Sequence, residues 1–141
     1  MEAIDKFRIE PIAGGTLHSR LAFDKSLSLE VAGVTIEAQF RCSRGYLVVT
    51  SDGNPYEEII HFYLLSEGGE VLDELSLGRI YHSGTLRDVV PHAGDRLEFS
   101  FFGRERWCLS ILDKARLQPP SLFSSVRRKG WSHYLSLQKN T

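Results

Sequence analysis

Cysteine is scarce in this sequence, and only Cys42 and Cys108 occur among the 141 residues. Two cysteines are too few for a disulfide scaffold, and neither lies at the spacing of a zinc-binding pair. Both fall on expected strands, which predicts buried thiols, with a disulfide between facing sheets as the alternative. Stability is therefore expected to come from one hydrophobic core, which a chain of this length can enclose.

Long apolar runs are also absent. The richest apolar segment, 59–65, has the length of a strand and contains His61, whereas a membrane-spanning helix needs roughly 20 apolar residues. The first residues, MEAIDKFRIEPIAGG, carry acids early and lack the basic start and apolar stretch of a secretory signal. These absences argue against a membrane protein and predict a cytoplasmic one.

Motifs for nucleotide binding and for nucleophilic catalysis are missing as well. The glycine pairs at 14–15 and 68–69 have neither the spacing nor the following lysine of a phosphate-binding loop. Ser83 follows His82 but lacks the Gly-x-Ser-x-Gly context that exposes a nucleophilic serine on a sharp turn. We therefore predict no catalytic residue and no cofactor.

The five histidines include no closely spaced pair, so the local sequence gives no metal motif. His61 and His82 lie on expected strands, and separate strands can bring ligands together around one ion. These two residues are the candidates for a metal-dependent, cupin-like enzyme, which is the alternative to a non-catalytic function. The simpler interpretation is that either one is a partly buried histidine with hydrogen-bonded ring nitrogens.

Charge is present in ordinary amounts but is distributed unevenly. The formal net charge is −1, from 17 basic and 18 acidic residues. No acidic residue follows Asp113, whereas six of the basic residues do, so residues 1–113 carry −7 and residues 114–141 carry +6. Such a basic segment indicates an anionic partner, which can also be the acidic body of the same protein.

Alternation of apolar and polar residues over 27–40 predicts two strands with one buried face. A two-residue turn at 32–33 would place Leu29 opposite Ile36 and align the apolar residues of both strands on that face. The turn chemistry and the alternation thus predict the same hairpin.

A second hairpin is predicted around the polar loop at 103–105, with Phe101 opposite Trp107. The loop before it, at 91–95, is indicated by its Pro, Gly and Asp residues. The residues of this hairpin that are predicted for the core are Leu97, Phe99, Phe101, Trp107, Leu109 and Ile111.

The segment 59–65 is predicted to pair with 71–77 across a turn at 68–69. Phe62 would then face Leu75, but the alternation fails near the turn, which indicates either a β-bulge or a strand that crosses between sheets. Because 59–65 is apolar on both sides, it must be covered on both faces.

Further short strands at 79–82 and 85–90 bring the expected number to nine or ten. The spacing is typical of an all-β fold, and we predict an antiparallel β-sandwich of jelly-roll or immunoglobulin-like type. Residues 16–115 are expected to form this domain. Residues 1–15 are expected to be an arm or a first strand, and residues 116–141 a basic, aromatic-containing extension.

Two prolines at 119–120 prevent a helix from continuing through the start of this extension. A short helix is possible over 121–129. Beyond it, alternation predicts a strand with Trp131, His133 and Leu135 on one face and Tyr134 and Leu137 on the other. We expect this apolar segment to dock either on its own domain or on a partner.

The residues of the extension that are predicted to bind a partner are Arg127, Arg128, Lys129, Trp131 and Tyr134. Adjacent cations and aromatics can bind single-stranded nucleic acid, but the acidic body would repel a polyanion. We therefore predict a non-catalytic binding or assembly module that recognises a protein partner, or forms a homo-oligomer, through sheet edge, loops and extension. Nucleic-acid binding is a further alternative.

A polymeric carbohydrate is a second ligand class that this scaffold could recognise. Exposed aromatic rings would serve as platforms for sugars, and the candidates are Tyr46, Tyr56, Tyr81 and Trp107, although the alternation favours a core position for Trp107. Recognition is expected on loops, because rigid β scaffolds present their variable contacts there. The loops concerned are 51–55, 83–85 and 91–95.

Overall fold

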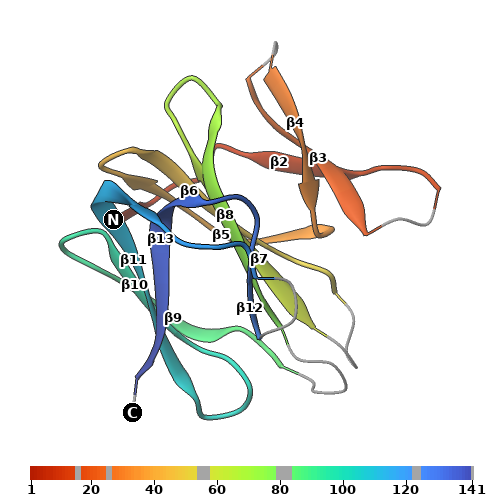
Figure 1. Ribbon diagram of the computed structural model, residues 1–141. Coiled ribbons are helices and arrows are strands. Elements are labelled where there is room, and N and C mark those ends of the chain that lie inside the picture. The colour runs from red at the N-terminus through yellow and green to blue at the C-terminus, as the bar shows by residue number, and fades with distance from the viewer. Residues whose placement is uncertain (15–16, 25–26, 54–57, 79–83, 122–124, 141) are drawn as a thin grey trace.

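The computed structural model describes residues 1–14, 17–24, 27–53, 58–78, 84–121 and 125–140 (Figure 1). These residues form an all-β protein with thirteen strands in three antiparallel sheets, more strands than the nine or ten expected. In this part of the chain no helix is long and apolar enough to cross a membrane.

The three sheets are built from strands that are far apart in the sequence. The six-stranded sheet runs in the spatial order β1 (Glu2–Ala3), β5 (Thr35–Cys42), β6 (Gly45–Ser51), β7 (Ile59–Leu65), β8 (Val71–Gly78) and β12 (Val126–Arg128). The four-stranded sheet runs in the order β13 (Ser132–Asn140), β11 (Arg106–Leu117), β10 (Arg96–Ser100) and β9 (Arg87–His92). The three-stranded sheet runs in the order β2 (Arg8–Pro11), β3 (His18–Asp24) and β4 (Leu27–Ala32).

The central strands β6 and β7 of the six-stranded sheet are buried on both faces, which successive side chains of a strand occupy in turn. One face packs against the four-stranded sheet, and these two sheets share the larger core cluster, to which Phe62, Leu64 and Trp107 belong. The other face packs against the three-stranded sheet in a smaller cluster that includes Tyr63 and Leu65. Figure 1 shows the outer sheets on opposite sides of the molecule. The expectation that 59–65 is covered on both faces is confirmed.

The pairing of β7 with β8 follows the predicted register. Phe62 lies opposite Leu75, and the register shifts between Leu64 and Leu65, next to the turn. The irregularity is therefore a β-bulge rather than a crossing between sheets, because β7 stays paired with β8 on both sides of it.

The predicted hairpin within 27–40 is wrong. β4 pairs with β3, so that Leu29 lies opposite Leu21, whereas β5 pairs with β6 and β1. At Gly33 the chain leaves one sheet for another with a φ of +96°, and a Cβ there would lie 2.6 Å from Thr50 Oγ1. Glycine is the residue that tolerates both the positive φ and the close approach. Alternation identified the strands but not their partners.

The hairpin of β10 and β11 is confirmed, but its register differs from the prediction by two residues. Phe99, not Phe101, lies opposite Trp107. β10 ends at Ser100, two residues before the predicted end at Phe102, and Phe102 lies in the turn with a positive φ of 56°. A shift of two residues keeps every side chain on its face, so all six predicted core residues are buried.

The predicted loop at 91–95 is shorter than expected, because β9 continues through Pro91 and His92 and the turn is confined to 93–95. Proline is tolerated here because β9 is an edge strand of its sheet. The strand expected at 85–90 begins at Arg87. The strand expected at 79–82 lies outside the described residues.

The first fifteen residues and the last sixteen contribute strands. β1 and β2 lie at the edges of two different sheets, and Phe7 between them is buried in the smaller core cluster. At the other end, β12 pairs with β8 and β13 pairs with β11, so both strands dock on their own chain.

Two details of the C-terminal prediction are wrong. Residues 126–128 are a strand and not part of a helix, because the open edge of β8 pairs with them and such pairing overrides a weak local helical preference. Leu137 lies on the buried face with His133 and Leu135, opposite to Tyr134. Trp131 precedes the strand and is 61% exposed.

Candidate functional site

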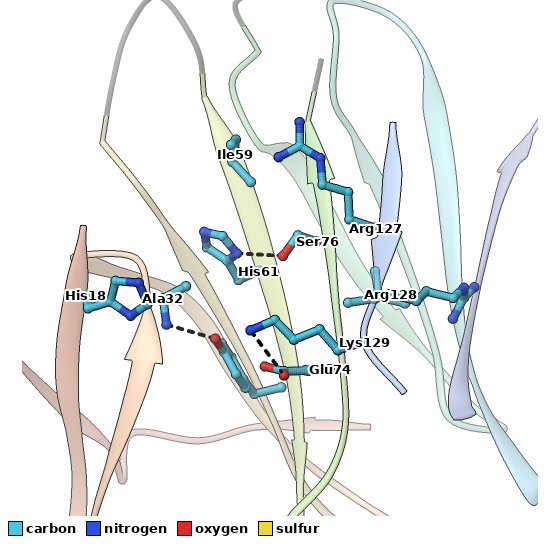
Figure 2. Close-up of a pocket in the computed structure, with 11 residues that line it drawn as sticks. His18, Ala32, Ile59, His61, Glu74, Ser76, Arg127, Arg128 and Lys129 are labelled. Atoms are coloured by element: carbon cyan, nitrogen blue, oxygen red, sulfur yellow. Dashed lines mark hydrogen bonds and ion pairs between the residues drawn. The ribbon is translucent and has the colours of Figure 1, made fainter. Parts of the chain in front are cut away.

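A cavity of about 230 Å³ opens on the face of the six-stranded sheet that the three-stranded sheet covers only in part (Figure 2). Its floor is formed by β7, β8 and β12, and its far wall by β3 and β4. The polar residues that line it are His18, His61, Tyr63, Glu74, Ser76, Arg127, Arg128 and Lys129.

The floor of the cavity contains one polar row across three strands. His61 of β7 lies opposite Ser76 of β8, and Ser76 lies opposite Arg127 of β12. Residues that are directly opposite in antiparallel strands have their side chains on the same face. The sheet register therefore brings together three polar residues that are 15 and 51 positions apart in the sequence.

A chain of two short hydrogen bonds links His61 to a carboxylate and a hydroxyl. His61 Nε2 lies 2.8 Å from Asp52 Oδ1, and His61 Nδ1 lies 2.7 Å from Ser76 Oγ. His61 and Asp52 are each only 8% exposed, whereas Ser76 is half-buried. A carboxylate can only accept, so Nε2 carries the proton in this pair, and a neutral ring then offers Nδ1 to the hydroxyl of Ser76.

Next to this row, Tyr63 connects the floor of the cavity to its wall. Its hydroxyl oxygen accepts a hydrogen bond from the backbone N–H of Ala32 at 2.8 Å. Burial raises the pKa of Tyr63 to about 12, and the nearby carboxylate of Glu74 adds to this effect. The phenol stays neutral, and its role is to hold β4 against β7.

The three consecutive cations of β12 and its end are divided between two faces, because neighbouring residues of a strand point in opposite directions. All three residues border the cavity, but the guanidinium of Arg128 lies on the other side of the sheet. Lys129 Nζ lies 3.6 Å from Glu74 Oε1. The Nε atom of Arg127 is buried and has no hydrogen-bond partner among the described residues. In Figure 2 the guanidinium of Arg128 points away from His61, towards the other side of the sheet.

Arg128 is directed into the interior, where it is 6% exposed and its Nη1 donates to the carbonyl of Leu135 at 2.7 Å. Burial lowers the pKa of Arg128, against an opposing effect of Asp73. The other two predicted contact residues lie elsewhere: Trp131 is exposed, and the ring of Tyr134 is covered by the guanidinium of Arg44 at 4.1 Å. The five residues predicted to bind a partner do not share one surface.

A second buried polar cluster lies on the opposite face of β8. One carboxylate oxygen of Asp73 accepts from the backbone N–H groups of Tyr134 and Leu135, each at 2.9 Å, and the other lies 3.0 Å from His133 Nδ1. His133 Nε2 lies 3.0 Å from the carbonyl of Gly130. This cluster fastens the start of β13 to β8.

Metal-ligating side chains are not grouped in the described part of the chain, where no three His, Cys, Asp or Glu residues could hold one ion. Both ring nitrogens of His61 are used in hydrogen bonds, and His82 lies outside the described residues.

Cys42 and Cys108 are half-buried free thiols, so the alternative of a disulfide is not realised in this structure. Burial is the main cause of the raised pKa of Cys42.

The candidate platforms for carbohydrate are not exposed where the structure describes them. Tyr46 is 4% exposed and Trp107 is 5% exposed, and both belong to the core. Tyr56 and Tyr81 lie outside the described residues.

Sequence reasoning missed Asp52 and Ser76. Asp52 stands in a predicted loop and Ser76 between two leucines of a predicted strand, and neither position carries a motif. The available signal was the pairing of 59–65 with 71–77, which already placed His61 opposite Ser76.

Comparison with known protein families, curated proteins and solved structures gave no match.

Proposed function

We propose that this chain is a binding module, not a turnover enzyme, that recognises an acidic segment of a protein partner at the cavity. The observation that carries this proposal is the position of Arg127, which lines the cavity and whose buried Nε has no hydrogen-bond partner within the part of the chain that the structure describes. A buried donor without an acceptor is costly, and an incoming carboxylate would remove that cost.

The other charges around the cavity favour the same ligand. Lys129 has a largely exposed side chain, and Glu74 is its single acidic neighbour in the lining that is described. Trp131, two residues further on, exposes most of its ring. Tryptophan and arginine are both enriched at protein-binding surfaces.

We further propose that the six-stranded and four-stranded sheets form an antiparallel β-sandwich, of jelly-roll or immunoglobulin-like type, that holds this surface rigid. The core cluster shared by the two sheets supports this assignment. In this proposal, residues 116–141 are the basic extension of the sandwich and supply the contact residues.

The proposal is tested with a short polyglutamate peptide, whose binding to the full chain is measured by calorimetry at low ionic strength. Arg127→Gln combined with Lys129→Gln is expected to weaken binding about tenfold, because two surface charge pairs are lost. Lys114→Gln removes an exposed cation of β11 outside the cavity and is the matched control, expected to bind as the unmodified chain does.

Two results would overturn the proposal: no binding of the acidic peptide at low salt, or equal affinity in the double variant and the control. A single-stranded oligonucleotide of similar charge is measured in parallel. Tighter binding of the oligonucleotide, lost in the same double variant, would replace the protein ligand by nucleic acid.

A further inference from the structure

We propose that Ser76 is a nucleophile, activated by His61, which takes an acyl group from an activated ester that enters the cavity. This inference goes beyond recognition of an acidic partner, since it depends on the Asp52, His61 and Ser76 side chains and not on Arg127 or Lys129. A hydroxyl within hydrogen-bond reach of a base that a third group orients is the arrangement of an activated nucleophile.

The geometry meets each part of that arrangement. Ser76 Oγ is 2.7 Å from His61 Nδ1, and His61 Nε2 is 2.8 Å from Asp52 Oδ1. The Asp52 side chain is 7% exposed and the His61 side chain 10% exposed, so water competes little for either bond. Ser76 itself lines the cavity, where a small ester can reach it.

Two other hydroxyls of the same region are not bonded to an imidazole. Thr50 Oγ1 donates to the carbonyl of Ala32, and Ser51 Oγ donates to the carboxylate of Glu37 at 2.6 Å. A hydrogen bond to a carbonyl or to a carboxylate orients a hydroxyl, but only the imidazole combines that contact with a base suited to neutral pH. Among these three, Ser76 is therefore the residue expected to react.

The acyl transfer exchanges the acyl–oxygen bond of the substrate ester for one to Ser76. The Oγ of Ser76 forms a bond to the carbonyl carbon of the ester, while its proton passes to Nδ1 of His61. Asp52 accepts the hydrogen bond from Nε2–H and stabilises the imidazolium. The tetrahedral intermediate then expels the leaving group, which takes the proton from Nδ1, and Ser76 is left as an ester.

Reaction is expected to stop at this ester. The ester on Ser76 is an alkyl ester with a poor leaving group. Its hydrolysis therefore needs backbone N–H groups directed at the developing oxyanion. Around Ser76 such groups are occupied, because Leu75 to Leu77 are paired with β7 on one side and with β12 on the other. One acyl group per chain, rather than turnover, is the predicted outcome.

The test uses p-nitrophenyl acetate on the full-length folded chain. We expect a burst of one equivalent of nitrophenolate without steady release, and an acetyl group mapped to Ser76 by peptide mass spectrometry. Ser76→Ala should abolish the burst, while Ser51→Ala should retain it. The chain unfolded in urea should not be acetylated at Ser76, which links reactivity to the fold without any variant.

His61→Gln is expected to slow acetylation of Ser76 about 100-fold, which is within the usual contribution of a general base. Asp52→Asn tests a positioning residue, and it should lower the acetylation rate while circular dichroism and thermal unfolding remain those of a folded protein. No acetylation of Ser76, or an equal rate in His61→Gln, overturns the inference. If acetylation fails while Ser76→Ala still binds the acidic peptide, the inference about Ser76 is wrong and the proposed recognition stands.

Discussion

Glu58 illustrates how neighbouring carboxylates affect one residue beside the candidate site. Burial is the main cause of its raised pKa, and the charge of Asp52 adds to it, although the backbone N–H of Gly53 donates to its carboxylate at 3.1 Å. A carboxyl group whose pKa is higher in the folded state binds its proton more tightly there. Its ionised form therefore destabilises the fold, and stability falls as the pH rises through the titration of Glu58.

Replacing Glu58 by glutamine removes this charge and keeps an oxygen for Gly53. We expect Glu58→Gln to raise the free energy of unfolding at pH 7 by less than about 1 kcal/mol, because the group is partly exposed and solvent screens it. The gain should disappear below about pH 4, where the acid is protonated in both states. Urea denaturation at the two pH values measures this difference.

Glu10→Gln alters an exposed carboxylate on β2 and should leave the free energy of unfolding close to its original value at both pH values. A decrease in stability for Glu58→Gln at pH 7 would contradict the assigned cause of the pKa shift.

At the same scale, the limits of sequence reasoning are visible in single side chains. His61 could be identified as a residue to examine, because histidine on a strand is uncommon enough to notice. Asp52 and Ser76 could not, since an isolated aspartate in a loop and a serine between leucines have many ordinary explanations. Their significance depends on a distance of less than 3 Å to the same ring, which only the folded chain defines.

β12 is a strand of three residues that joins two sheets. It pairs with β8 through its backbone, and Arg128 donates to the carbonyl of Leu135 on β13. We expect Arg128→Met to lower the free energy of unfolding by about 1–3 kcal/mol, because it leaves that buried carbonyl without a donor. Chemical denaturation monitored by circular dichroism provides the measurement.

Lys129→Met is the matched control for this change, since the side chain of Lys129 is 74% exposed and its pair with Glu74 is a surface one. It should alter stability by less than about 1 kcal/mol. Equal losses in the two variants would indicate that Arg128 contributes nothing beyond the other cations of this segment.

Hairpins show which elements a sequence can define. The β7–β8 pairing was predictable because the turn and the apolar positions on both sides agreed. The bulge was also indicated, by the failure of the alternation near the turn. The separation of β4 from β5 was not, since a strand that changes sheets at Gly33 has the same alternation as one that folds back. The strand β12 was missed because its formation depends on β8, some fifty residues earlier in the chain.

For the whole molecule, the central feature is one sheet that supplies both core clusters. Leu64 and Leu65 are adjacent on β7, yet each is fully buried in a different cluster. We expect Leu64→Ala and Leu65→Ala each to cost about 2–5 kcal/mol. Because both clusters depend on the six-stranded sheet, either change should increase amide hydrogen exchange in β3 and in β10 together.

Leu117→Ala, at a position that is 81% exposed, should change stability by no more than about 0.5 kcal/mol. If Leu65→Ala increased exchange only in the three-stranded sheet, that sheet would be an independently unfolding unit. The all-β class was predictable from the sequence as a whole. The third sheet was not, because local alternation does not indicate how many sheets pack together.

The two tryptophans occupy opposite environments, since Trp107 is enclosed in the larger cluster and Trp131 is largely exposed to solvent. The protein therefore carries a built-in optical probe on its surface, two residues after Lys129 in the sequence, and an internal reference in its core. Iodide should quench the emission of Trp131 selectively, and a partner that covers the segment after Lys129 would shield that ring while the emission of Trp107 stays constant.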